Sequence, residues 1–284
     1  MEDLSNRLAL HTWTLDTTPL ADALRIARKT GWNAAEVRRS DFVRCLEDGM
    51  TNAEVIELIR SSGIKVAVLG TEYGLLFAKG AEQRRLLDVL AQTCANAGAL
   101  GCDVIMTATG ALSGSVAEAA DNLRRAGDVV AAHGLRLAYE FSSAHETVNR
   151  LDIAREIIAR TRHPACGLLL DVYHLERSGA AGRGFEDVPV EEIFAVQYSD
   201  VPDAPLPGGL RPADRLAPGQ GVVRWDEVLG LLIEKGYRGY LSYEAPNPAS
   251  WSRPPEVVAR EAVVATRSLL SSARADAYFQ QEDK

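Results

Sequence analysis

One arrangement of apolar and polar positions recurs along the chain: an amphipathic helical segment ends in glycine, and a short apolar segment follows within a few residues. Glycine favours the left-handed conformation just past a helix, so each copy predicts a helix end that leads into a strand. Alternation of this kind is typical of β-α-β units in a parallel sheet. The copies are KTG-WNAAEV, SSG-IKVAVL, ALG-CDVIMT, AHG-LRLAYE and EKG-YRGYLSYE.

Over the whole chain, the pattern predicts eight strands in alternation with about eight helices. The expected strands are Leu8–Thr12, Ala34–Val37, Lys65–Leu69, Asp103–Thr107, Arg136–Phe141, Gly167–Asp171, Ile193–Tyr198 and Gly239–Tyr243. The expected helices cover residues 19–31, 51–63, 82–100, 115–134, 148–160, 225–235 and 255–270, with only short helical turns within 175–190.

No linker divides this alternation, so it predicts a single (β/α)₈ TIM barrel over residues 1–272. An open doubly wound sheet is the rival, but the first strand is not followed by G-x-G-x-x-G or a P-loop motif. Residues 273–284 are polar and charged, and we expect a frayed tail or an assembly segment there. Segment 200–223 holds five prolines and is long for a loop, which is typical of a functional loop.

Polar side chains end four of the expected strands. Asp171 follows the apolar run Leu168–Leu170, and a carboxylate at the end of a buried strand is costly unless it is paired. The carboxyl ends of barrel strands lie on one face, with adjacent strands about 5 Å apart, so the four side chains should surround one point. They are Glu140, Asp171, Gln197 and Glu244.

A divalent cation would relieve the repulsion among three carboxylates placed this close together. All four donors are oxygens, Gln197 through its amide, so Mg²⁺ or Mn²⁺ is favoured and Co²⁺ is tolerated. The alternative is that each acidic strand end forms a salt bridge with a loop Lys or Arg. We favour the metal because the pattern occupies four consecutive strands.

Three further residues are candidates for contact with a substrate. His174 lies three positions after Asp171 and is either a substrate hydrogen-bond donor, a fifth metal ligand or a structural histidine. His11 ends the first strand and either lines the pocket or is structural. Arg215, late in the long loop, either reaches over the metal with its fork of donors or lies on the surface.

Two tryptophans and one glutamate lie near other strand ends. Trp13 and Trp251 either form walls of a sugar pocket or pack in the core. Glu36 ends the second strand near Arg38, and we expect an ion pair between them at the mouth of the barrel.

Composition narrows the class of protein. The 284 residues carry a net charge of −8, with a pI near 5.3, which argues against a nucleic-acid surface. The sequence shows no secretory signal and no apolar run long enough to span a bilayer. The four cysteines lie far apart, as expected for reduced thiols in a cytoplasmic protein. We expect either a homodimer or a homotetramer, and the sequence does not decide between them.

Four segments resemble one known family: LAYEF…TVN at 137–149, GLLLDVYH at 167–174, DRLAPGQG at 214–221 and GYRGYLSYEAPNP at 236–248. Through them, nearly the whole chain resembles the xylose isomerase-like TIM barrels, a superfamily of sugar phosphate isomerases and epimerases. The resemblance is greatest to the inosose (2-keto-myo-inositol) isomerase branch.

The resemblance implies a metal site at Glu140, Asp171, position 197 and Glu244, with His174 and Arg215 matching the family's histidine and loop arginine. Most members have His at position 197, where this chain has Gln. Members that resemble hydroxypyruvate isomerase also carry Gln there. The change leaves the substrate open and favours Mn²⁺ or Mg²⁺ over Zn²⁺.

The implied reaction is isomerisation or epimerisation of a small polyol or ketose. The metal would stabilise an enediolate, and Glu140 or Glu244 would move the proton. Loss of a β-hydroxyl at the same site would make the protein a lyase, resembling inosose dehydratase or 3-dehydroshikimate dehydratase. DNA repair, known in relatives of this barrel, needs several metals and many histidine ligands. This chain has only five histidines, which argues against that function. A non-catalytic barrel subunit is supported only by Gln197.

Overall fold

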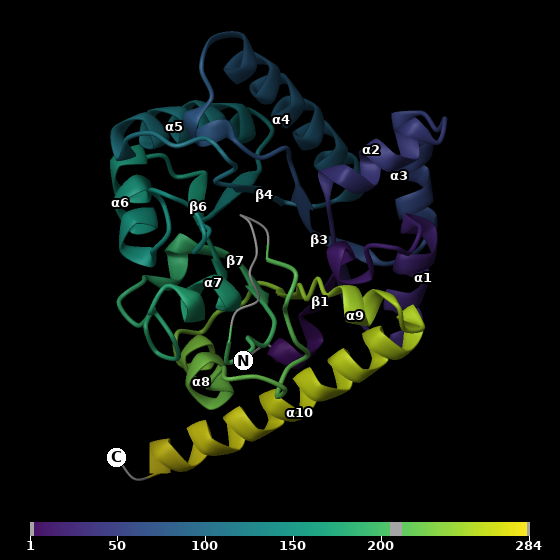
Figure 1. Cartoon of the computed structure of the whole chain (residues 1–284), viewed down its shortest axis with the longest axis vertical. Helices are drawn as coiled ribbons and strands as arrows, with labels where there is room; N and C mark the ends of the chain where they lie inside the picture. Colours follow the sequence, from purple (N-terminus) through teal and green to yellow (C-terminus); the bar gives the residue numbers. More distant parts are fainter. Residues whose placement is uncertain (1–2, 205–211, 283–284) are drawn as a thin grey trace.

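Eight short apolar segments form the strands of a closed barrel in a computed structural model that describes residues 3–204 and 212–282. The strands pair in chain order and in parallel, and the last one closes on the first (Figure 1). The (β/α)₈ barrel is therefore confirmed, and the open doubly wound sheet is wrong. The strands are β1 (Leu8–His11), β2 (Ala34–Val37), β3 (Lys65–Gly70), β4 (Val104–Ala108), β5 (Arg136–Glu140), β6 (Cys166–Asp171), β7 (Ile193–Tyr198) and β8 (Leu241–Tyr243).

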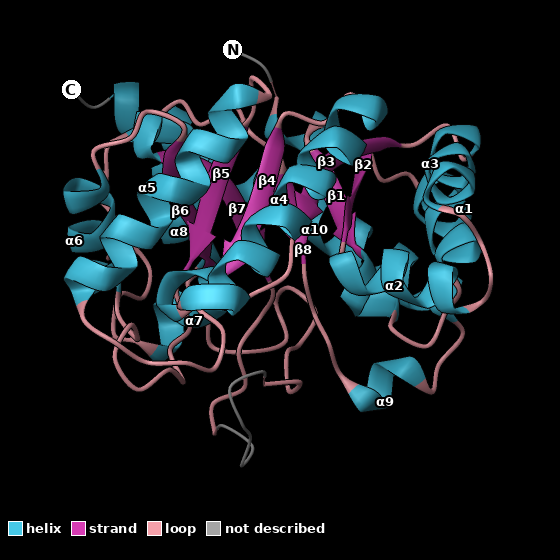
Figure 2. Ribbon diagram, turned by 90° about the horizontal axis from the view of Figure 1, so that it is seen from above, coloured by secondary structure: helices cyan, strands magenta, loops and turns pink. Residues whose placement is uncertain are grey.

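Helices surround the barrel, and the loops at the carboxyl ends of the strands gather on one side of it (Figure 2). Short 3₁₀ turns cover Leu4–Asn6, Thr12–Leu15, Leu75–Phe77 and Val190–Glu192. The α-helices are α1 (Leu20–Thr30), α2 (Arg39–Glu47), α3 (Asn52–Ser61), α4 (Gly80–Leu100), α5 (Val116–Ala132), α6 (Leu151–Thr161), α7 (Val172–Arg177), α8 (Trp225–Glu234), α9 (Pro248–Trp251) and α10 (Pro255–Glu282).

Glycines that follow the amphipathic segments end helices, as predicted. Gly31 and Gly101 follow α1 and α4 in the left-handed region, with φ of 96° and 65°. Thr51 and Ser115 cap α3 and α5, and each shares a capping box with a glutamate three residues later. None of the helices in the described ranges is long and apolar enough to cross a bilayer.

The last helix is longer than expected. We predicted an end near Leu270 and a separate tail from residue 273, but α10 continues to Glu282, along one side of the molecule in Figure 1. The added stretch SSARADAYFQQE contains neither Gly nor Pro, so nothing in it stops a helix. Residues 283–284 of the expected tail lie outside the described residues.

A period of two along the strands separates the barrel interior into an apolar and a polar layer. Side chains two positions apart on a strand face the same side. Small or apolar inward residues such as Ala9, Ala138 and Leu169 form a cluster inside the barrel. The residue two positions further on is polar in six strands. The pairs are Ala9/His11, Ala34/Glu36, Ala138/Glu140, Leu169/Asp171, Ala195/Gln197 and Ser242/Glu244.

Asp200, just after β7, anchors the long loop over the carboxyl end of the barrel. The side chain is fully buried. Its carboxylate accepts hydrogen bonds from the backbone N–H groups of Val201 (2.9 Å), Gly219 (2.7 Å) and Val223 (3.1 Å) and from Nε1 of Trp225 (2.9 Å). Residues 205–211 of the predicted functional loop lie outside the described residues.

Replacing Asp200 with Ala removes the shared acceptor and leaves buried N–H groups unpaired, so the free energy of unfolding should fall by about 3 kcal/mol. Urea unfolding followed by circular dichroism measures the loss. Asp88 is exposed on α4, and Asp88→Ala should change stability by less than about 0.5 kcal/mol. Equal losses in the two variants would contradict the anchoring role of Asp200.

Candidate active site

The polar ends of β5 to β8 lie together at the carboxyl face of the barrel. Asp171 and Gln197 are direct partners in the β6–β7 register, and the N–H of Glu244 donates to the carbonyl of Tyr198 at the end of β7. Glu140 ends β5, opposite Leu169. All four predicted side chains are buried, with exposed fractions of 0–7%. The sequence therefore predicted correctly which strand ends meet, although their roles stay predictions.

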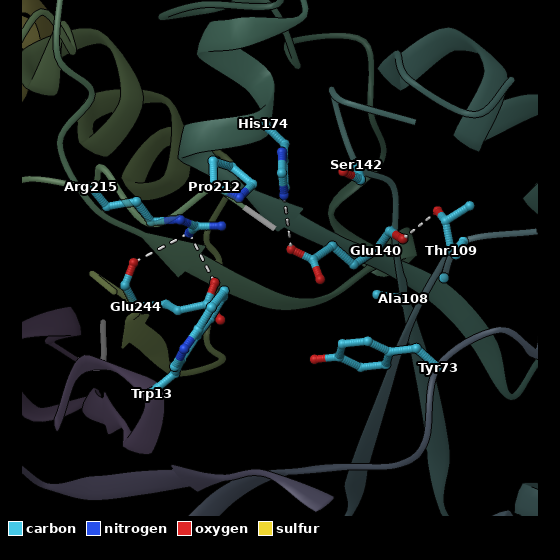
Figure 3. A pocket seen from close by; sticks show the side chains of 12 residues that line it. Trp13, Tyr73, Ala108, Thr109, Glu140, Ser142, His174, Pro212, Arg215 and Glu244 are labelled. Atoms are coloured by element: carbon cyan, nitrogen blue, oxygen red, sulfur yellow. Dashed lines mark hydrogen bonds and ion pairs between the residues drawn. The ribbon is translucent and has the colours of Figure 1, made fainter. Parts of the chain in front are cut away.

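A cavity of about 160 Å³ opens above these strand ends. Glu140 and Glu244 line it, whereas Asp171 and Gln197 are completely buried. Trp13 forms part of the cavity wall, in agreement with the sugar-pocket interpretation. Trp251 ends α9 and is not among the lining residues. Figure 3 shows the side chains around the cavity. The lining residues are Trp13, Tyr73, Ala108, Thr109, Gly110, Ala111, Glu140, Ser142, His174, Pro212, Arg215 and Glu244.

Arg215 reaches from the long loop into this group of carboxylates. Its Nη1 lies 2.7 Å from Oδ2 of Asp171 and 2.9 Å from Oε2 of Glu244 (Figure 3 shows the second contact). The guanidinium also stacks over the ring of Tyr173, 4.6 Å from its centroid. Burial alone would lower the pKa of Arg215, but Asp171, Glu244 and Glu140 raise it, so the side chain stays charged. The surface alternative for Arg215 is wrong.

Two side-chain contacts hold the loop that carries Arg215. The hydroxyl of Tyr173 donates to Oδ1 of Asp214 over 2.7 Å. The side-chain amide of Asn247 donates to the carbonyl of Arg215 over 2.9 Å. The sequence did not predict these contacts, because each joins segments that are far apart in the chain. They place Arg215 before any ligand arrives.

His174 faces the site as a hydrogen-bond donor. Its Nδ1 accepts from the backbone N–H of Ser143 over 3.2 Å, so a neutral ring carries its proton on Nε2. Nε2 lies 3.7 Å from Oε1 of Glu140 and 3.8 Å from Oδ2 of Asp171. Burial lowers the pKa of His174 to about 4, although Asp171 opposes the shift, so the ring is neutral near pH 7.

His11 lies within the barrel and contacts two carboxylates. Nδ1 accepts from the backbone N–H of Trp13 over 3.1 Å, which directs Nε2 towards Oε1 of Glu244 at 3.3 Å and Oε1 of Glu36 at 3.7 Å. His11 is 1% exposed, and its contact with substrate stays a prediction.

Glu36 does not form the ion pair with Arg38 that we expected. Arg38 instead pairs with Asp41, whereas Glu36 lies inside the barrel, 1% exposed. Nε2 of Gln197 donates to Oε1 of Glu36 over 2.8 Å. Burial raises the pKa of Glu36 from 4.5 to about 8, and the charge of Glu244 adds to the rise. The period of two after Ala34 was the signal in the sequence that places Glu36 inward.

The buried carboxylates carry more negative charge than Arg215 can offset. Burial raises the pKa of Glu140 well above its usual range, and the charges of Glu244 and Asp171 add to the rise, against the opposing effect of Arg215. Without a further cation, part of this cluster binds protons near neutral pH. A divalent cation would replace those protons.

Three side chains lie close enough together to share such a cation. Within the described residues, ligand atoms of Glu140, Asp171 and His174 lie within 4.8 Å of one another. The proton on Nε2 makes His174 the weaker candidate among these three. Oε1 of Gln197 is buried and accepts no hydrogen bond, which suits a metal ligand. Glu244 is not part of this group of three. Glu140, Asp171, Gln197 and Glu244 stay the predicted metal ligands.

Comparison with known proteins identifies the family. The chain matches the xylose isomerase-like TIM barrel family over residues 24–269, and it belongs to that family. It is 26% identical to an inosose isomerase of Halalkalibacterium halodurans over 245 residues, which cover 83% of this chain and 86% of that protein. It is 31% identical to a 3-dehydroshikimate dehydratase of Pseudomonas aeruginosa over 182 residues, which cover 60% of this chain and 27% of that protein.

A solved structure supports the same fold. The crystal structure of the IolI protein with a bound zinc atom superposes with a TM-score of 0.84 at 21% identity. The match covers 94% of this chain and 99% of that one. At this level of identity, the likeness shows the fold.

A pH dependence of stability follows from Glu36. In metal-free protein, the folded state holds this proton up to about pH 8, whereas the unfolded chain releases it near pH 4.5. The contribution of Glu36 to stability is therefore complete below pH 4.5 and falls as the pH rises to about 8. Glu36→Gln cannot titrate, so the variant should gain roughly 1 kcal/mol per pH unit relative to the wild type across this window.

Urea unfolding in the presence of a chelator, at several pH values in that window, measures the difference in the free energy of unfolding between Glu36→Gln and the wild type. Titrating groups that do not interact with Glu36 behave alike in both proteins and cancel in the difference, whereas Glu140 and Glu244 interact with Glu36 and contribute to it. Parallel stability profiles would show that Glu36 is ionised in the folded protein.

Proposed function

We propose that this protein is a divalent-metal-dependent isomerase or epimerase of a small sugar or keto-inositol. The observation that carries the proposal is the convergence of three buried carboxylates and one unpaired amide oxygen beneath a cavity at the carboxyl ends of β5 to β8. Active sites of TIM barrels lie at this face. The named relatives include inosose isomerases, whose substrates have the hydroxyketone that such a site would suit.

The residues that would hold the metal are Glu140, Asp171, Gln197 and Glu244. Oxygen donors favour Mn²⁺ or Mg²⁺, and the zinc atom in the IolI structure keeps Zn²⁺ and Co²⁺ among the candidates. When bound, the ion would polarise a substrate carbonyl and stabilise the enediolate that forms on loss of the neighbouring proton.

Two carboxylates border the cavity and can move that proton. Burial raises the pKa of the Glu140 carboxyl group, so its carboxylate would be a stronger base than that of an exposed glutamate. Glu244 lies in the same cavity on β8, close to His11 and Arg215. Transfer by one carboxylate to the adjacent carbon would give isomerisation, and delivery to the opposite face would give epimerisation.

His174 and Arg215 would orient the substrate. Both line the cavity, and both present N–H donors towards it. Arg215 cannot lose its proton near neutral pH, and neutral His174 donates from Nε2. These donors suit the hydroxyl and carbonyl oxygens of a polyol. Trp13 would cover one face of the ring and limit the access of water.

A dehydratase is the second candidate. It is supported by the relatives named 3-dehydroshikimate dehydratase, one of them 31% identical over 182 residues. The same carboxylates would remove the proton, and a β-hydroxyl would leave as water. The oligomeric state and the cytoplasmic location stay predictions from the sequence.

The test begins with elemental analysis of the purified protein and continues with turnover of inosose, ketopentoses, ketohexoses and 3-dehydroshikimate. We expect about one divalent ion per chain and turnover of at least one compound. Glu244→Gln should reduce kcat about a thousandfold, because it removes a base and a ligand charge. Glu146→Gln makes the same change at an exposed position and should keep full activity. Full activity in Glu244→Gln would exclude the role of Glu244.

Turnover in D₂O separates the two reactions. An isomerase or epimerase should incorporate solvent deuterium at the carbon beside the carbonyl. Its product should have lost no water relative to the substrate. A dehydratase should give a product lighter by one water. Mass spectrometry of the product reads both, and deuterium exchange without dehydration would support the leading proposal.

A further inference from the structure

A second cavity, of about 370 Å³, lies beside the candidate active site. It is formed by the start of α2 and the loop after β3. Tyr73 lines both cavities, so its ring belongs to the wall that they share. Figure 3 shows Tyr73 across the first cavity from Arg215. The residues around the second cavity are Arg38, Arg39, Ser40, Val43, Thr71, Glu72 and Tyr73.

Two of the three charged side chains that line the second cavity already have partners. Nη2 of Arg38 lies 2.6 Å from Oδ1 of Asp41, and Nη1 lies 2.6 Å from Oδ1 of Asp16. Glu72 accepts from Nη1 of Arg85 over 3.1 Å. These contacts neutralise Arg38 and Glu72, so neither has a free charge to offer a ligand.

Arg39 is the third charged residue. Its side chain is half-buried, and its Nε is buried without a hydrogen-bond partner. No acidic residue in the described part of the chain forms an ion pair with it. Arg44, five residues further along α2, is by contrast paired with Asp16 at 2.9 Å. The second cavity therefore carries a net positive charge from a guanidinium that has no acidic partner among the residues that the structure describes.

We propose that this cavity binds an anionic substituent of the substrate, a carboxylate or a phosphate, through Arg39. The fork of donors in a guanidinium matches the oxygens of either group, and a charged acceptor would satisfy the buried Nε. The hydroxyketone would lie at Glu140 and Glu244, and the anionic end would pass Tyr73. This inference rests on the proposed function, because it places the reacting end of the substrate in the first cavity.

The hydroxyl of Ser40 lines the same cavity beside Arg39 and can add a neutral donor. The substrate class that follows is a small acidic hydroxyketone. A neutral keto-inositol would fill the first cavity and leave Arg39 unused. The two substrate types should therefore differ in their dependence on Arg39.

The experiment compares the wild type, Arg39→Met and Arg44→Met, all loaded with Mn²⁺. Arg44→Met is the matched control, because it removes the same charge from the same helix outside the cavity. KM is measured for 3-dehydroshikimate, a phosphorylated ketose and inosose. Arg39→Met should raise KM about tenfold or more for an anionic compound that is turned over, and by less than about twofold for inosose. Arg44→Met should leave all values unchanged.

Inorganic phosphate gives a reading that does not need turnover. Its affinity for the metal-free proteins, followed by ³¹P line broadening, should fall about tenfold in Arg39→Met and stay constant in Arg44→Met. Equal phosphate binding by the wild type and Arg39→Met, or equal effects of Arg39→Met on neutral and anionic substrates, would overturn the anion site. If no hydroxyketone reacts but phosphate binding needs Arg39, the anion site stands and the proposed function fails.

Discussion

The contact of Arg215 with Asp171 and Glu244 is the interaction on which the carboxyl face of the barrel depends. These side chains are almost completely buried, and unpaired charges in such a place are strongly unfavourable. One guanidinium neutralises part of the cluster. Burial raises the pKa of Glu140 and of Glu36, and the neighbouring carboxylates add to the rise, so protons or a further cation would relieve the rest. The need for positive charge thus connects the fold to the proposed metal chemistry.

The barrel and the grouping of its polar strand ends could be predicted from the sequence because both depend on local patterns. Helix-ending glycines and apolar strands predict the element order, and six of the eight strands place one polar side chain at the carboxyl face. The short helix α2, which begins with the charged residues Arg39 and Asp41, was not predicted. The helix α7 begins earlier than the helical turns expected within 175–190, because it follows Asp171 without a break. The end of α10 was not predicted, because the polar composition of residues 273–284 is typical of a terminal tail.

Contacts between distant segments account for what the sequence did not reveal. The bond from Gln197 to Glu36 joins residues 161 positions apart, and no local signal specifies it. That bond also gives the side-chain amide of Gln197 a defined orientation. The amide nitrogen satisfies Glu36 and leaves the amide oxygen for a cation. A histidine that gains a proton can no longer bind a metal, whereas an amide gains no proton near neutral pH. A glutamine ligand would therefore bind over a wider pH range.

The central claim is that one divalent cation binds among the oxygens at the ends of β5 to β8. Anomalous diffraction from crystals of this protein grown with Mn²⁺ tests it most directly. The account predicts one strong peak within bonding distance of Glu140, Asp171, Gln197 and Glu244, at about 2.0–2.4 Å from each donor oxygen. A peak elsewhere, or no peak while Arg215 still bridges Asp171 and Glu244, would contradict it.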